Sequence, residues 1–190
     1  MENTEYFDRF EAHLLEELLK LCTSHQMLDG TLLASEDIDG LWKEFAPHYM
    51  ADAVSQINSY PAAAIAWAGY VGMAVAHHWD SDWEAFQNSA YSDLHGPQGF
   101  DDMDENILQH HLGLDLEGKQ AGRIEDTLRS CAHLAMTLIR REDTEAQSTK
   151  AFYIFARTAR ALFKIGAALE LKRLGYKFEK MNIGENPIFS

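Results

Sequence analysis

The chain has 190 residues, of which 46% are hydrophobic and 24% charged, and its formal net charge is −14. These values are typical of a globular protein and exclude a disordered or low-complexity chain. The acidic balance also argues against nucleic-acid binding, which needs clustered Lys and Arg to contact phosphates. The length fits one domain of roughly 100–200 residues, so we expect residues 1–190 to form a single helical domain.

The cysteines and the amino terminus point to the cytoplasm. Cys22 and Cys131 each lie within an apolar helical pattern, which predicts buried thiols in a reducing compartment. The acidic amino terminus lacks the apolar stretch of a secretory signal. The purely apolar residues 62–76 number 15, fewer than the about 20 that a bilayer-spanning helix requires. We therefore expect a cytoplasmic protein with no membrane segment.

Apolar residues recur at spacings of three and four along the first half of the chain, as on the buried face of a helix. A first helix is expected over residues 4–27. A second begins at Ser35, which is a good N-cap residue, and Pro47 is expected to open a third, short helix that reaches residue 57. A longer apolar helix is expected over residues 61–79.

The second half of the chain also shows helical patterns, and capping boxes at Ser81–Glu84 and Thr144–Gln147 predict where two of its helices begin. Further helices are expected over residues 81–94, 102–111, 117–141 and about 30 residues from Thr144 to Gly175. The predicted fold class is therefore all-α, an irregular bundle of about six to eight helices with the apolar helix near 61–79 at its centre. Residues 181–190 are expected to form a docked or mobile tail.

Two histidine pairs near carboxylates suggest a metal site. Imidazole and carboxylate groups on facing helices are common ligands of zinc, iron and manganese. The candidate ligands are His77, His78, Asp82, His110 and His111. The competing interpretation is that both pairs lie at helix ends, where histidine is favoured by the helix dipole, and that Ser81 separates His78 from Asp82. No HExxH motif supports the metal interpretation, so no cofactor is predicted, and a divalent metal stays an alternative.

Two other groups contain a possible ligand pair. Glu44 and His48 are four residues apart, but Pro47 between them is expected to interrupt the helix. His13 with Glu16 and Glu17 resembles half of a metal site whose other half is missing from the pattern.

Aromatic residues are concentrated between positions 42 and 91. Rings with polar tips can line a ligand pocket, and a helix of small residues leaves space for one. The candidate pocket residues are Trp67, Tyr70, Trp79 and Trp83. Alternatively, these rings fill the space that the Ala and Gly residues leave in the core.

Charge is distributed unevenly along the chain. Residues 1–139 hold 6 Lys and Arg against 24 Asp and Glu, whereas residues 140–190 hold 10 against 6. The last predicted helix carries a basic stripe of Lys150, Arg157, Arg160 and Lys164. This stripe could bind an anion or an acidic protein partner, or it could pair with the acidic helices of residues 1–139, within one subunit or across a dimer.

No complete catalytic motif is present, so the sequence leaves the function unknown. The leading hypothesis is a non-catalytic helical-bundle protein that acts by self-association, as a homo-oligomer, or by binding an acidic protein partner. The alternative is a metal-dependent or small-molecule-binding enzyme with its site around His77/His78 and His110/His111. A third possibility is a protein that binds an apolar ligand near Trp67 and Tyr70.

Overall fold

A computed structural model describes residues 4–176, so the tail predicted over 181–190 lies outside the described residues. The described part of the chain is helical and contains no strand, only an isolated bridge between Gly96 and Gly99. The prediction of an all-α fold is confirmed. The helical elements in order are α1 (Thr4–Ser24), α2 (Glu36–Val54), α3 (Pro61–Phe86), η1 (Tyr91–Leu94), α4 (Met103–Asn106), η2 (Ile107–His111), α5 (Lys119–Arg140) and α6 (Thr149–Arg173).

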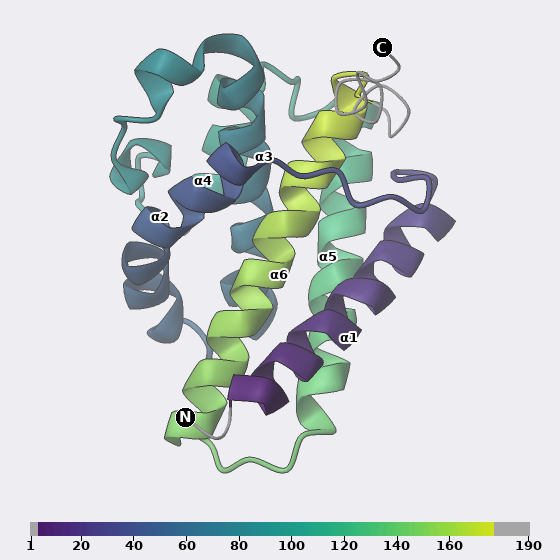
Figure 1. Cartoon of the computed structure of the whole chain (residues 1–190). Helices are drawn as coiled ribbons and strands as arrows, with labels where there is room; N and C mark the ends of the chain where they lie inside the picture. The colour runs from purple at the N-terminus through teal and green to yellow at the C-terminus, as the bar shows by residue number, and fades with distance from the viewer. Residues whose placement is uncertain (1–3, 177–190) are drawn as a thin grey trace.

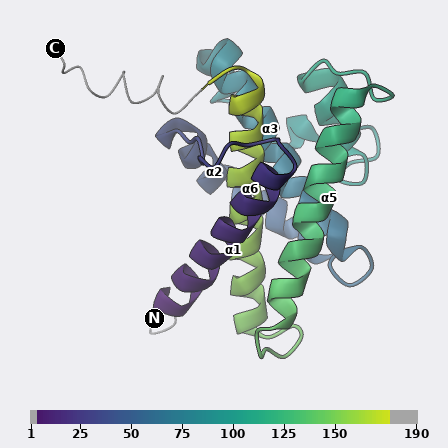
Figure 2. The same cartoon turned by 90° about the vertical axis from the view of Figure 1, so that its right-hand side faces the viewer.

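Helices α3 and α6 pack against each other at the centre of the bundle, and the other long helices surround them (Figures 1 and 2). Glycines at the crossing allow the two backbones to touch. A Cβ atom at Gly72 would overlap the carbonyl oxygen of Phe163, and one at Gly166 would overlap that of Gly69. Only glycine fits at such contacts, because any side chain would push the helices apart.

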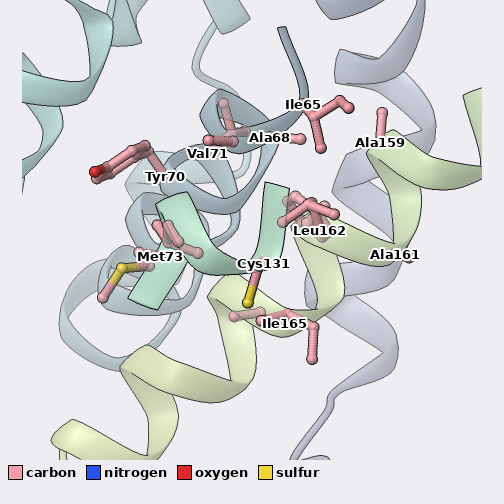
Figure 3. Close-up of a cluster of buried hydrophobic side chains, with 14 of the residues drawn as sticks. Ile65, Ala68, Tyr70, Val71, Met73, Cys131, Ala159, Ala161, Leu162 and Ile165 are labelled. Carbon is pink, nitrogen blue, oxygen red and sulfur yellow. The ribbon is translucent and has the colours of Figure 1, made fainter. Parts of the chain in front are cut away.

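The core lies where α3, α5 and α6 meet (Figure 3). Ile65 and Val71 of α3 are at most 1% exposed, and Cys131 of α5 and Leu162 of α6 are fully buried beside them. Each such side chain stabilises the fold by about 1.5–3 kcal/mol through the burial of apolar surface. Residues 61–79 therefore occupy the centre that the sequence predicts. Within the described residues, no helix is both long and apolar enough to cross a membrane.

Pro47 does not separate two helices, as the sequence analysis expected. It lies inside α2, which continues from Glu36 to Val54. A proline within a helix has no N–H to donate and costs about 3 kcal/mol in an isolated helix. Burial of Phe45 and Tyr49 on either side of it, together with a 2.6 Å hydrogen bond from the Tyr49 hydroxyl to the carbonyl of Ala64, stabilises the continuous helix.

Two predicted helix starts are shifted. The chain breaks at Asp82, whose backbone is non-helical and whose carboxylate accepts a hydrogen bond from the Ala85 amide, rather than at Ser81. The helix after this break ends at Phe86 and does not reach residue 94. Likewise α6 is capped by Ser148, which accepts from the Ala151 amide, rather than by Thr144.

Candidate functional site

The continuous helix α2 brings together three polar residues that the predicted break at Pro47 would have separated. Glu44, His48 and Asp52 follow one another at intervals of four residues, so they project from the same side of the helix. All three line one pocket of about 380 Å³. A volume of this size lies within the range of small-molecule sites.

The opposite wall of this pocket comes from the segment that follows α3. Residues 87–90 leave the helix, and the side chain of Asp93 accepts a hydrogen bond from the amide of Ala90, which orders the short turn η1. Tyr91 and His95, at the start and just after the end of η1, face the α2 residues across the pocket. We call this site the α2–η1 pocket; its lining residues are Glu44, Phe45, His48, Ala51, Asp52, Ser89, Ala90, Tyr91, Ser92 and His95.

Asp52 is the centre of the hydrogen bonding in the pocket. Its Oδ2 accepts a 3.0 Å hydrogen bond from the hydroxyl of Tyr91 and lies 2.9 Å from Nε2 of His95. Burial and the nearby Asp52 raise the pKa of Tyr91, so its hydroxyl stays protonated and donates. An ionised carboxylate can only accept, so His95 carries a proton on Nε2 and leaves Nδ1 as the nitrogen that can gain a second one.

Aromatic rings stabilise this arrangement from behind. Tyr91 is only 5% exposed, and its ring meets His95 edge-on and lies parallel to His48 at 6.4 Å. Phe45 packs against the same ring from α2. The packing fixes the direction of the Tyr91 hydroxyl, and the hydroxyl in turn holds the carboxylate of Asp52 in place. A carboxylate that orients an imidazole beside an open pocket is a common arrangement for general acid–base chemistry.

The predicted histidine site is brought together only in part. Nε2 of His78 lies 2.8 Å from Nδ1 of His111, so one histidine of the first pair contacts one histidine of the second pair. His77 instead points its Nδ1 at the carboxylate of Glu170, 2.8 Å away. His110 is exposed, and Asp82 caps the helix segment after the break.

Burial keeps the paired imidazoles neutral. Desolvation, helped by the neighbouring histidines, lowers the pKa of His78 to about 4, and desolvation also lowers the pKa of His111. Neutral imidazoles are suitable metal ligands, but a structural zinc site usually has four ligands from the protein. Within the described residues, only His13, Glu16 and Glu17 place three potential ligand atoms within 4.8 Å of one another, and His13 and Glu16 are exposed. A metal at the histidine pairs stays the alternative interpretation.

Glu170, the partner of His77, is a fully buried carboxylate in the core of the bundle. Arg173 donates two hydrogen bonds of 2.7 Å to it, one from Nε and one from Nη2. This bidentate pair compensates the charge that burial would otherwise make very costly. The network ties α3 to the last turn of α6.

Two of the four predicted aromatic pocket residues share a cavity. Trp67 and Tyr70 meet edge-on at 5.5 Å and line a cavity of about 280 Å³ together with Asp104. Trp79 packs elsewhere, against Tyr176, and Trp83 is half-buried against the core. The remaining lining residues of this cavity, which we call the Trp67–Tyr70 cavity, are Ala62, Ala63, Ala66, Glu125, Arg129 and His133.

Two residues of the basic stripe pair with α1. Glu11 is 4% exposed. Its carboxylate accepts two hydrogen bonds of 2.8 and 2.6 Å from Arg160 and a third of 3.1 Å from Arg157. Arg157 also binds Asp8 at 2.7 Å. Lys150 lies over the ring of Tyr6. These contacts neutralise much of the stripe within the chain.

The comparisons with known proteins add no resemblance: no family model, curated protein or solved structure matches this chain. The α2–η1 pocket was missed by the sequence analysis, which noted Glu44 and His48 but set them aside because of Pro47. The available signal was the spacing of four continuing to Asp52, with apolar Phe45 and Tyr49 on the adjoining face of the same helix.

Proposed function

We propose that this protein binds a small polar molecule in the α2–η1 pocket and transfers a proton to or from it through His95. The observation that carries the proposal is the 2.9 Å contact between Nε2 of His95 and Oδ2 of Asp52 at the wall of an open pocket of about 380 Å³. A positioned imidazole is the commonest general base in proteins because its pKa lies near neutral pH.

Each residue has a distinct part in this function. His95 takes the proton on Nδ1, and the imidazolium that forms is stabilised by the adjacent carboxylate of Asp52. Tyr91 holds that carboxylate in place through its own hydrogen bond. Glu44 and His48 provide polar contacts on the α2 side of the pocket.

The test is a fragment screen read by amide and side-chain NMR. Fragments that bind should shift resonances of residues 44–52 and 89–95. Incubating the bound fragments in D₂O should place deuterium at an acidic C–H position with the wild-type chain and not with His95→Gln. Fragments that gather at another part of the chain, or a library with no binder in this pocket, would contradict the proposal.

A second candidate function is self-association, favoured by an apolar groove between α2 and α6. Val54 and Phe152 are 44% and 46% exposed, which is unusual for large apolar side chains, and both line this groove. Its charged lining residues, Lys43, Arg157 and Arg160, are all basic. The two arginines pair with Glu11 of the same chain, so the acidic surface of residues 1–139 in a second copy would complement chiefly Lys43.

Light scattering tests this second candidate. A mass of twice 21.5 kDa that returns to 21.5 kDa in Phe152→Glu would support it. A monomer mass for the wild-type chain at every concentration measured would exclude it without affecting the α2–η1 pocket.

A further inference from the structure

The charges around the α2–η1 pocket indicate which class of molecule it takes. The charged side chains that line it, apart from histidines, are the carboxylates of Glu44 and Asp52. Asp93 adds a third carboxylate at the same turn. The neighbouring cation on α2, Lys43, lines the groove on another side of that helix. In an acidic chain, such a pocket attracts cations and repels anions.

One carboxylate oxygen is left for a ligand. Tyr91 and His95 both bind Oδ2 of Asp52, and within residues 4–176 no side chain bonds its Oδ1. Asp52 is partly exposed, with 31% of its side chain accessible. A ligand donor could therefore reach Oδ1 without displacing either existing partner.

A single metal ion fits this donor set poorly. Glu44, His48, Asp52 and His95 offer oxygen and nitrogen ligands, but no three of them come within 4.8 Å of one another in the described structure. A coordinated ion requires ligand atoms about 2.0–2.6 Å from its centre. The donors are spread over a wider space, which an organic cation can span.

The remaining lining is suited to the body of such a cation. The ring of Tyr91 from η1 lies parallel to the ring of His48 from α2, and Phe45, Ala51 and Ala90 contribute apolar surface. Aromatic faces attract ammonium groups through the negative potential above the ring. The pocket thus combines carboxylates for a positive end with ring surface for an apolar end.

We propose that the ligand of the α2–η1 pocket is a small organic ammonium ion, held by Asp52 and Glu44 and covered by the Tyr91 and His48 rings. The inference rests on the proposed function and deepens it by naming the class of ligand that the pocket takes.

Three probes with the same ring test the charge preference. Benzylamine, benzyl alcohol and benzoate are titrated separately at about pH 7.5, where an alkyl amine is protonated, and the amide shifts of residues 44–52 and 89–95 are followed. Benzylamine should bind roughly tenfold or more tightly than benzyl alcohol, the effect of one charge-assisted hydrogen bond. Benzoate should not bind at this pocket.

Variants of the two carboxylates test whether these groups cause the preference for benzylamine. Asp52→Asn and Glu44→Gln should each weaken benzylamine and leave benzyl alcohol unchanged. Glu84→Gln, at an exposed carboxylate of α3 that does not line the pocket, is the matched control and should leave both unchanged. Glu44 is exposed on the helix surface, so its variant tests the idea even where Asp52→Asn fails to fold.

The outcomes separate this inference from the proposed function. Equal binding of benzyl alcohol or benzoate in the pocket would overturn the ammonium preference and leave the proposed function standing. Absence of shifts at residues 44–52 and 89–95 with all three probes would overturn both.

Discussion

At the scale of single residues, Asp104 is a carboxyl group in an environment that opposes its charge. It lies beside the Trp67–Tyr70 cavity, and burial, with help from Glu105 and Glu125, raises its pKa to about 6. The folded chain therefore binds this proton more tightly than the unfolded chain. Stability from this group is present below the unfolded pKa of about 4 and is lost as the pH rises through about 6.

Asp104→Asn should consequently stabilise the protein above pH 6 and have little effect near pH 4. Because the side chain is only partly buried, we expect a gain of about 1 kcal/mol at pH 8 after allowance for solvent screening. Urea unfolding of both chains at pH 4.5 and pH 8 measures the difference. A constant difference across this range would contradict the assigned environment of Asp104.

Single residues also show why the site was harder to predict than the fold. Glu44 and His48 were visible in the sequence, but Pro47 predicted a break between them. What maintains the helix is the tertiary burial of Phe45 and Tyr49, a contribution that local propensity does not contain. The partner His95 lies 43 residues after Asp52, and nothing in the local pattern specifies that approach.

At the scale of the elements, the close crossing of α3 and α6 depends on glycine. Gly72→Ala would place a methyl group against the carbonyl of Phe163 and the amide of Ala167, both backbone atoms that cannot turn aside. We expect a loss of about 3 kcal/mol or more in the free energy of unfolding, or failure to fold. Thermal unfolding followed by circular dichroism measures this effect.

Gly122→Ala is the matched control for that variant. Gly122 lies within α5 and has no atom within 4 Å of the position where a Cβ would be. The same substitution should there stabilise the protein by about 0.5–1 kcal/mol, because alanine favours the helix. If both variants changed stability by the same amount, the tight crossing would not be what limits residue size at Gly72.

The long elements were predictable from periodicity, whereas their ends were less so. α1 and α5 bury the faces that spacings of three and four indicate, and the apolar part of α3 is buried on nearly every side. On α6, the apolar side chain of Phe152 is 46% exposed. It lies in the first turn of α6.

Capping signals were ambiguous because two nearby residues could each serve as the N-cap of the same helix. Both Ser81 and Asp82 are good N-cap residues, and the backbone turns at Asp82. Thr144 matched a capping box, yet Ser148 four residues later caps α6.

On the scale of the whole molecule, α1 is held to the bundle by a buried charge network. Glu11 is almost fully enclosed and is shared by Arg157 and Arg160 of α6. Glu11→Gln keeps the side-chain shape but removes the carboxylate that pairs with Arg160, and it leaves Arg157 with Asp8 as its ion-pair partner. We expect a loss of about 2–4 kcal/mol, with faster amide hydrogen exchange in α1 than in α5.

Glu5→Gln provides the comparison for that change. Glu5 pairs with Arg9 on the outer surface of the same helix, and its side chain is 85% exposed. Exposed pairs contribute little to stability, so unfolding and exchange should both resemble the wild type. Equal effects of the two substitutions would mean that the network around Glu11 does not hold α1.

A second contact between α1 and the bundle joins two cysteine thiols rather than charged groups. Sγ of Cys22 on α1 and Sγ of Cys131 on α5 are 3.6 Å apart, and both residues are fully buried. The contact with Cys22, together with burial, raises the pKa of the Cys131 thiol, so it is unreactive while α1 stays packed. Diamide should oxidise the two thiols to an intramolecular disulfide, itself becoming the hydrazine, only when α1 opens.

The rate of that reaction should therefore report how often α1 leaves the bundle. Glu11→Gln should accelerate disulfide formation, measured by thiol labelling and mass spectrometry, while Glu5→Gln should not. Once formed, the bond closes a loop of more than 100 residues and should raise the melting temperature, in line with a stabilisation of about 2–4 kcal/mol. A rate equal in all three chains would show that the thiols are reached by a route other than the opening of α1.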